Sequence, residues 1–198
     1  MSDLFDQPDD AATPLTADEK NGLKPAHIAT RGQLNIAEQE NVARGQEWAS
    51  RRRQPVLSER FVTELHRHMF DDVWRWAGRF RSTERNIGIE SWKIPAELRT
   101  LIDDTKAQIE AKAYSPDEIA IRFHHRLVFI HPFPNGNGRH ARLMAELLIE
   151  ELGGERFTWG RASLGDGSEV RGRYIAALKA ADNHDIGPLL AFARSKGD

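Results

Sequence analysis

The chain has 198 residues, of which 39% are hydrophobic and 29% are charged, and its net charge is −2. This length allows one well-cored domain with an N-terminal extension, and no apolar run is long enough to span a membrane. The near-neutral charge gives no sign of direct binding to nucleic acid or to a membrane surface, and the absence of cysteine excludes disulfides and thiolate metal sites.

Residues 1–29 are predicted to form an acidic and partly flexible N-terminal segment. Residues 1–13 are rich in Asp and have few apolar side chains to bury, which is typical of a loose terminus. The chain starts with acidic residues where a signal peptide would carry basic ones, so we expect a cytoplasmic protein. Thr16 and Glu19 have the spacing of a capping box, which predicts a short helix that ends at Gly22.

Residues 30–56 are predicted to hold one amphipathic helix. Thr30, followed three residues later by Gln, forms a second capping box, and the helix would run to about Arg53. One side of this helix is apolar and is expected to dock on a core: Leu34, Ala37, Val42, Trp48 and Ala49. Asn41 falls within this apolar stripe and Glu40 flanks it. A polar residue inside a docking face needs a hydrogen-bond partner.

The next helix is predicted to follow Pro55 and to be capped by Ser58. It carries apolar residues at four-residue steps: Phe61, Leu65 and Met69. His66 and His68 lie on this helix but face different sides, and neither has a second ligand at metal-binding spacing. We therefore interpret both histidines as structural or exposed residues.

The helical period fails between residues 80 and 94. Ile87 and Ile89, with Gly88 between them, are typical of short extended pieces and predict a small β-hairpin. An irregular loop is the alternative for this stretch.

Two further helices are predicted, one starting at Pro95 and one running from Ser115 through Ile130. The second places Ala120, Phe123, Leu127 and Ile130 on one side. Because it becomes apolar on nearly all sides towards its end, it is expected to be the central buried helix. His124 and His125 are neighbours that cannot face one ion from a helix, so we interpret them as packing or hydrogen-bonding residues.

The stretch that carries the chemistry is HPFPNGNGRHAR, residues 131–142. Gly136 and Gly138 remove side chains where the backbone must bend and where a ligand would approach the amides closely. A helix is expected to start near Arg139, and its first turn would present unpaired N–H groups and a positive dipole end to the loop. Such a helix terminus is suited to bind an anion.

Three side chains of this stretch complete the pattern. Arg139 and Arg142 are three positions apart and can lean towards the same anion. His131 lies at the other end of the loop and has an ordinary pKa suited to proton transfer near neutral pH. A phosphate cradle that faces a base predicts phosphoryl or nucleotidyl transfer.

A second strongly apolar helix follows and is expected to end at Gly153. Two more helices are predicted around residues 170–181 and 189–192. The predicted fold class is therefore all-α, a helical bundle with one small β element and an N-terminal helical extension.

Residues 131–142 resemble the signature of Fic-domain (Fido) proteins of the Fic/DOC family, which has the form H-x-F-x-[D/E]-G-N-G-R-x-x-R. Every fixed position matches except one, where Asn135 stands in place of Asp or Glu. The resemblance extends from about Leu57 to Phe192, and the whole chain resembles the subgroup called mobile mystery protein B. It implies a Fic-type helical bundle with a hairpin flap, in which residues 57–195 are the Fido domain.

The resemblance implies a protein adenylyltransferase, a nucleotidyltransferase that moves AMP from ATP to a Ser, Thr or Tyr hydroxyl of a target protein (AMPylation). His131 would be the catalytic base. The nucleotide would be held by Asn135, Gly136, Asn137, Gly138, Arg139 and Arg142. The flap, represented by Ile87, Gly88 and Ile89, would hold the target segment by main-chain pairing.

The implied cofactor is Mg²⁺, with Asn135 as its candidate ligand. Because Mg²⁺ prefers charged oxygen ligands, a neutral amide at this position would weaken the metal site. Three outcomes are open: slower adenylylation, another metal or nucleotide preference, or a different reaction. Fic proteins also transfer phosphocholine or phosphate, or remove AMP.

Residues 30–56 then gain a second interpretation. Glu40-Asn41 resembles the end of the Fic inhibitory helix motif, [S/T]-x-x-x-E-[G/N], although Ile36 occupies the Ser/Thr position. The resemblance implies that Glu40 pairs with Arg142 and holds it away from the terminal phosphate, so that the isolated protein is autoinhibited. A surface glutamate on a docked helix is the alternative interpretation.

Two other functions are open at this point. One is a nucleotide-binding regulatory module that has lost turnover. The other is a histidine-based metal hydrolase, for which the ligand spacing is poor; it would use His124, His125, His131 and His140. Resemblance to the subgroup also implies a mobile-element setting and a companion DNA-binding protein.

Overall fold

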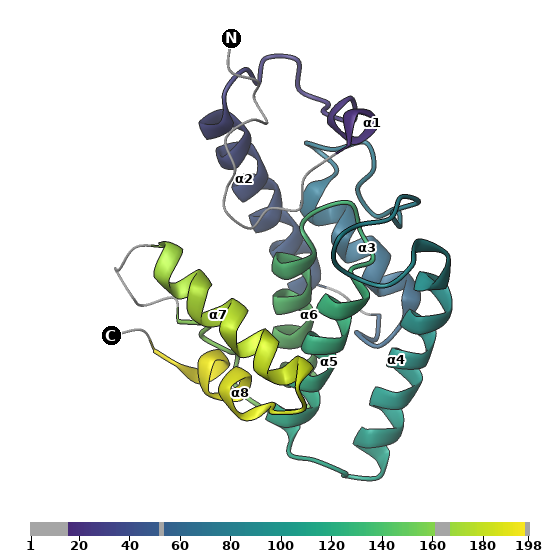
Figure 1. The fold of residues 1–198 in the computed structure, drawn as a ribbon, viewed down its shortest axis with the longest axis vertical. Coiled ribbons are helices and arrows are strands. Elements are labelled where there is room, and N and C mark those ends of the chain that lie inside the picture. Colours follow the sequence, from purple (N-terminus) through teal and green to yellow (C-terminus); the bar gives the residue numbers. More distant parts are fainter. Residues whose placement is uncertain (1–15, 52–53, 161–166, 197–198) are drawn as a thin grey trace.

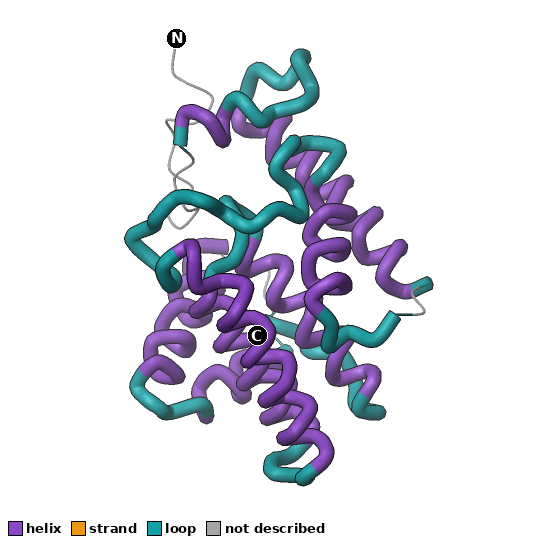
Figure 2. Tube along the Cα trace, turned by 90° about the vertical axis from the view of Figure 1, so that its right-hand side faces the viewer, coloured by secondary structure: helices purple, strands orange, loops and turns teal. Residues whose placement is uncertain are grey.

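The structure is a computed structural model that describes residues 16–51, 54–160 and 167–196. The regular elements of this part of the chain are helical, as Figure 2 shows, and the predicted all-α class is confirmed. The predicted flexibility of residues 1–13 lies outside the described residues. The elements are α1 (Ala17–Lys20), α2 (Arg31–Ser50), α3 (Glu59–Phe70), the short 3₁₀ helix η1 (Ser91–Lys93), α4 (Ile94–Glu110), α5 (Pro116–Ile130), α6 (Asn137–Glu151), α7 (Gly167–Asp182) and α8 (Gly187–Arg194).

The predicted helix starts are confirmed because each carries its own capping side chain. A hydroxyl at each N-cap accepts a hydrogen bond from the backbone N–H three residues later. These caps are Thr16, Thr30, Ser58 and Ser115. The end of α2 is less well predicted, since the helix stops at Ser50 and not at about Arg53.

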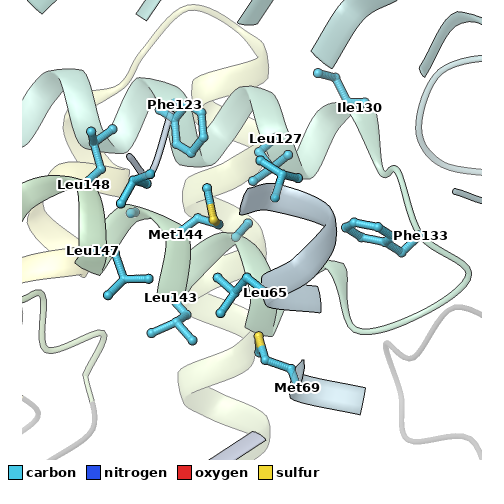
Figure 3. Close-up of a cluster of buried hydrophobic side chains, with 14 of the residues drawn as sticks. Leu65, Met69, Phe123, Leu127, Ile130, Phe133, Leu143, Met144, Leu147 and Leu148 are labelled. Carbon is cyan, nitrogen blue, oxygen red and sulfur yellow. The ribbon is translucent and has the colours of Figure 1, made fainter. Parts of the chain in front are cut away.

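The middle of the bundle is the pair α5 and α6, which lie side by side (Figure 1). Helix α4 packs on one side of α5 and α8 on another, while α3 packs on α2, α4 and α6. Figure 3 shows the core where α3, α5 and α6 meet. Its fully buried side chains include Leu65, Met69, Phe123, Leu127, Ile130 and Met144. Burial of each of these side chains contributes roughly 1.5–3 kcal/mol to folding stability. The loop that joins α5 to α6 is therefore anchored at both ends in a well-packed core.

Helix α2 docks on α3 through its apolar stripe. Asn41 lies inside that stripe and is buried, and its amide Nδ2 donates to the carbonyl of His68 at 3.0 Å. The Asn41 carbonyl Oδ1 accepts from the backbone N–H of Asp72 at 2.9 Å. The polar residue of the docking face therefore has the partners that the sequence required. These bonds also set the rotation of α2 about its axis.

The predicted β-hairpin between residues 80 and 94 is not formed. Within the described residues the β-type pairing consists of one isolated bridge, between Leu23 and Trp74. Side chains occupy the backbone groups that a ladder would need: Arg81 donates to the carbonyl of Ile89, and Glu84 accepts from the N–H of Ser91 at 3.0 Å. Apart from η1, the stretch is an irregular loop, which was the alternative interpretation. In the described part of the chain, no helix combines the length and the apolar character needed to cross a membrane.

Candidate active site

The loop between α5 and α6 is turned by a left-handed residue at each end. His131 caps α5 with φ 53° and ψ 59°, and Gly136 caps α6 with φ 78° and ψ 1°. A left-handed conformation costs a residue with a Cβ atom roughly 1–2 kcal/mol. At Gly136 a Cβ atom would also lie 2.5 Å from the ring of Phe70, so only glycine fits there. Helix α6 begins at Asn137, two residues before the predicted start near Arg139.

The side chain of Asn137 bonds to the backbone of Phe133 across the loop. Its Oδ1 accepts from the backbone N–H of Phe133 at 2.9 Å, and its Nδ2 donates to the carbonyl of Phe133 at 2.8 Å. Asn137 is buried, so its side chain shapes the loop. The predicted phosphate contact of Asn137 stays a prediction, and its backbone N–H is the group left to make it.

Two buried histidines support the loop from below. His66 stacks on Phe133, with 3.7 Å between ring centroids. Its Nδ1 accepts from the N–H of Gly78 at 2.9 Å, so Nε2 carries the proton that is donated to the carbonyl of Asn135 at 3.0 Å. His140 contacts the carbonyl of Val62 through Nε2 at 2.9 Å. Burial lowers the pKa of His66 well below its usual value and that of His140 to about 3, so both rings are neutral supports.

His124 and His125 are hydrogen-bonding residues, as predicted. His124 is fully buried and contacts the hydroxyl of Tyr174 through Nε2 at 3.0 Å, and burial lowers its pKa to about 3. His125 contacts Asp182 at 2.8 Å. Across the residues with described positions, no three His, Cys, Asp or Glu side chains are grouped so that they could hold a metal ion. The geometry therefore does not favour a histidine-based hydrolase.

His131 differs from these supports because it lies at the rim of the loop. It is 7% exposed, and its ring donates a hydrogen bond to the carbonyl of Val128. Burial, assisted by the positive charges of Arg81 and Arg85, lowers the pKa of His131 to about 4. The ring is therefore neutral at pH 7. Since one nitrogen donates to Val128, the other keeps a lone pair that can accept a proton.

The predicted flap residues lie directly against His131. A Cβ atom at Gly88 would be 2.6 Å from the Cβ of His131, and the backbone of Gly88 has φ 87°. Ile87 is 48% exposed beside it, and Ile89 is half-buried on the core. The backbone of residues 87–89 therefore passes close to the candidate base and presents one large apolar side chain to solvent.

Arg81 fastens this segment to the loop and was not found by sequence reasoning. Its side chain is fully buried, and Nε donates to the carbonyl of His131 at 2.7 Å. The other nitrogens donate to the carbonyls of Thr83, at 3.0 Å, and Ile89. No local sequence pattern marks Arg81, because the residue it holds lies 50 positions away.

Arg139 is paired with a carboxylate of α2, but the carboxylate is Glu38. The Nη2 of Arg139 lies 2.9 Å from Oε2 of Glu38, and Oε1 of Glu38 accepts from Nε1 of Trp74 at 2.7 Å. The guanidinium also lies over the ring of Phe70, 4.9 Å from its centroid. Glu40 is exposed, and its expected pairing with Arg142 is absent from the ion pairs of the described residues. Two helix positions rotate a side chain by about 200°, so Glu38 faces the loop and Glu40 faces away.

Within residues 16–51, 54–160 and 167–196, Arg142 contacts a phenol and no carboxylate. Its guanidinium lies 5.2 Å from the ring centroid of Tyr174 and donates a hydrogen bond to the hydroxyl. A Cβ atom at Gly138 would meet Nη1 of Arg142 at 3.7 Å and the Tyr174 hydroxyl at 4.0 Å. Arg142 and Tyr174 therefore lie in van der Waals range of the first turn of α6.

The residues present do not form a Mg²⁺ site by themselves. The Oδ1 of Asn135 accepts from the N–H of Gly136 at 2.5 Å, so the predicted ligand is engaged within its own loop. A neutral amide oxygen is also a weaker Mg²⁺ ligand than a carboxylate. No reaction step is therefore assigned to a metal.

Comparison with known proteins places these residues in context. The model of the Fic/DOC family matches residues 56–149. The protein named protein adenylyltransferase Fic from Nematostella vectensis is 29% identical over 139 residues, which cover 66% of this chain and 30% of that protein. This chain thus spans less than a third of the length of that relative.

Solved structures show the same fold. The N-terminal Fic domain of the Bep8 protein from Bartonella sp. 1-1C superposes with a TM-score of 0.70 at 15% identity, covering 91% of this chain and 95% of that one. The BepC protein from Bartonella tribocorum, whose structure holds bound AMPPNP, has a TM-score of 0.65 at 20% identity and covers 90% and 97%.

Proposed function

Because residues 56–149 match the model of the Fic/DOC family, we propose that this chain is a protein adenylyltransferase. It transfers AMP from ATP to a Ser, Thr or Tyr hydroxyl of a target protein. One observation carries the proposal: neutral His131 and the N-terminus of α6 lie at the two ends of a single loop. The name of the Nematostella relative and the AMPPNP bound to BepC support the choice of reaction and nucleotide.

The target hydroxyl oxygen attacks the α-phosphorus of ATP, a new O–P bond forms, and the bond to the pyrophosphate oxygen breaks. The hydroxyl proton moves to the ring nitrogen of His131 that does not donate to Val128, which supplies roughly 10²–10⁴ of the rate. The amides of Asn137 and Gly138, together with Arg139 and Arg142, hold the phosphates and offset the charge that develops on them.

Residues 87–89 hold the target. Their backbone is irregular in the free protein and lies against His131. A target strand pairs with this backbone while Ile87 covers an apolar side chain of the target. Pairing through the main chain demands no particular target sequence, so many hydroxyl-bearing segments would fit.

The α2 helix restrains the site through Glu38, in place of the predicted Glu40. An Arg139 that is bound to Glu38 is not free to bind a phosphate, so the isolated protein is held in a low-activity state. The restraint is moderate because the side chain of Arg139 is 34% exposed. The protein acts in the cytoplasm, where ATP is abundant. Its proposed partners are the target protein and a companion DNA-binding protein.

Labelled ATP tests the enzyme directly. Purified protein is incubated with α-labelled ATP, Mg²⁺ and a cell lysate, and label on protein is expected for the Glu38→Gln variant. The label should disappear when His131→Ala is added to that variant, although AMPPNP binding measured by calorimetry should persist.

Asn135 favours one competing function, a nucleotide-binding module without turnover, because it replaces the acidic residue of the Fic signature. Binding of AMPPNP without any protein label in the Glu38→Gln variant would support that module and contradict the enzyme.

A further inference from the structure

Arg81 joins its own segment, residues 80–93, to the start of the loop that follows α5. Its guanidinium donates to the carbonyls of His131, Thr83 and Ile89, and its own N–H donates to the carbonyl of Pro132 at 2.9 Å. The side chain is fully buried. A rigid fork with several donors can bridge carbonyls in this way, whereas a lysine ammonium cannot reproduce the planar geometry.

The first consequence concerns the conformation of His131. This residue is left-handed, a state that persists only where the surroundings determine it from several sides. Its N–H bonds to the carbonyl of Leu127 at 3.2 Å, its ring bonds to Val128, and its carbonyl bonds to Nε of Arg81 at 2.7 Å. The first two contacts come from the same helix, α5. The contact with Arg81 ties this residue to a different segment.

The second consequence concerns the distance between His131 and the flap backbone. Gly88 approaches so closely that an added Cβ atom would meet the His131 Cβ at 2.6 Å and Nη2 of Arg81 at 3.0 Å. The carbonyl of Ile89, the next residue, is bonded to that same Nη2. A single guanidinium therefore sets the spacing between the segment proposed to hold the target hydroxyl and the base proposed to accept its proton.

We propose that Arg81 is a positioning residue that aligns the target hydroxyl with His131 by holding residues 87–89 and the His131 backbone at one fixed separation. This inference rests on the proposed function for its catalytic consequence, but its structural content concerns the unliganded chain. Displacement of a reacting group by 1 Å can cost about 10² in rate.

The charged groups around His131 allow the two roles of Arg81, charge and geometry, to be separated. Arg81 and Arg85 are the cations that lower the pKa of His131. Each has an acidic neighbour: Glu84 lies 3.9 Å from Arg81, and Glu19 of α1 pairs with Arg85. Arg81→Lys keeps the positive charge but loses the fork, whereas Arg81→Gln loses both.

The test uses the full chain with Glu38→Gln as the active background. Arg81→Lys is expected to lower kcat about 10²-fold, while the Kd for AMPPNP changes by no more than about twofold because Arg81 touches none of the groups proposed to bind phosphate. Arg79→Gln is the matched control, since Arg79 lies on the same segment with its side chain exposed. Unchanged kcat in a folded Arg81→Lys protein would overturn the proposal.

A second measurement needs no enzymatic activity. Histidine ring NMR signals are followed against pH in the wild type, Arg81→Lys and Arg81→Gln. Removal of the nearby charge should raise the pKa of His131 in Arg81→Gln, and both variants should shift the His131 ring signals at pH 7. If Arg81→Lys only lowers the melting temperature and leaves the His131 signals in place, Arg81 is a stabilising residue and the proposal is wrong. If the active background transfers nothing, the proposed function fails while this NMR test still stands.

Gly88→Ala provides an independent variant in which Arg81 is intact. The added methyl group would push residues 87–89 away from His131. A fall in kcat with an unchanged AMPPNP Kd is expected, and an unchanged kcat would contradict the proposed dependence on spacing.

Discussion

Two of the segments that pack around the junction of α5 and α6 hold it by different chemistry. Residues 80–93 hold it through Arg81, a buried cation bonded to neutral backbone carbonyls. Helix α2 holds it through Glu38, whose ion pair with Arg139 leaves the arginine 34% exposed. The first contact can be lost only by disturbing the backbone. The second can be released by moving one side chain, so the proposed base is fixed in place whereas Arg139, proposed to bind phosphate, is adjustable.

The largest expected effect is the loss of folding stability in acid, which is caused by buried histidines near the loop. His124 and His140 are buried with pKa values of about 3, whereas an unfolded histidine titrates near 6.5. The unfolded state therefore binds protons first as the pH falls. Stability should be complete above about pH 6.5 and should decline towards pH 3, by roughly 1 kcal/mol per pH unit for each histidine.

Urea unfolding at a series of pH values measures this decline. His140→Asn should reduce the slope, since it removes one of the buried histidines whose pKa is lowered by folding. A free energy of unfolding that stays flat between pH 7 and pH 5 would show that the rings are not held neutral.

A smaller effect on the fixed side is expected from Gly136→Ala. The change places a Cβ atom 2.5 Å from the Phe70 ring at a residue with φ 78°, and strain with overpacking should cost about 2 kcal/mol or more. Thermal unfolding measures the loss. Gly172→Ala is the control, because nothing lies within 4 Å of a Cβ atom there, and it should be neutral or slightly stabilising.

Changes at the Glu38–Arg139 pair should raise activity instead of lowering stability. Glu38→Gln removes the charge that holds Arg139 but keeps an oxygen for Trp74, and transfer should rise about fivefold, as expected for a partly exposed ion pair of roughly 1 kcal/mol. The rate of self-modification is the measurement. Glu40→Gln is the matched control on the same helix and should change nothing. Activation by Glu40→Gln alone would restore the original prediction and would remove the role of Glu38.

The smallest effect is expected from Asn135→Asp. The carboxylate would add charge beside the amides proposed to bind phosphate and should make transfer more strongly dependent on Mg²⁺, by about a factor of a few. A Mg²⁺ titration of the rate measures it. Identical titration curves for the wild type and the Asn135→Asp variant would show that this position does not face the ion.

Local signals in the sequence were sufficient for the helices and for the position of the loop. Caps such as Thr30 and Ser58 act on amides three residues away, and the interruption of the helical pattern at residues 131–136 is equally local. The choice between Glu38 and Glu40 was not local, because it depends on the rotation of α2, which Asn41 sets through residues 68 and 72. A helical wheel puts Glu38 on the same face as Leu34 and Asn41, and this face would have favoured Glu38 over Glu40 as the partner of an arginine in the loop region.

Two local features could not be predicted from the sequence for the same physical reason. The hairpin was predicted from the pattern of Ile87, Gly88 and Ile89, but the carbonyl of Ile89 is taken by Arg81. The side chain of Asn137 likewise bonds to the backbone of Phe133, while the contact of Asn137 with phosphate stays a prediction. In both cases a side chain competes for a backbone group, and sequence periodicity carries no information on that competition.

The indole of Trp74 gives this arrangement an optical consequence. Trp74 donates to the same carboxylate that pairs with Arg139, and its ring stacks on Trp76 with 5.0 Å between centroids. A nucleotide that draws Arg139 away from Glu38 changes the electric field at this indole. Intrinsic fluorescence would then report release of the restraint in real time, without any attached dye.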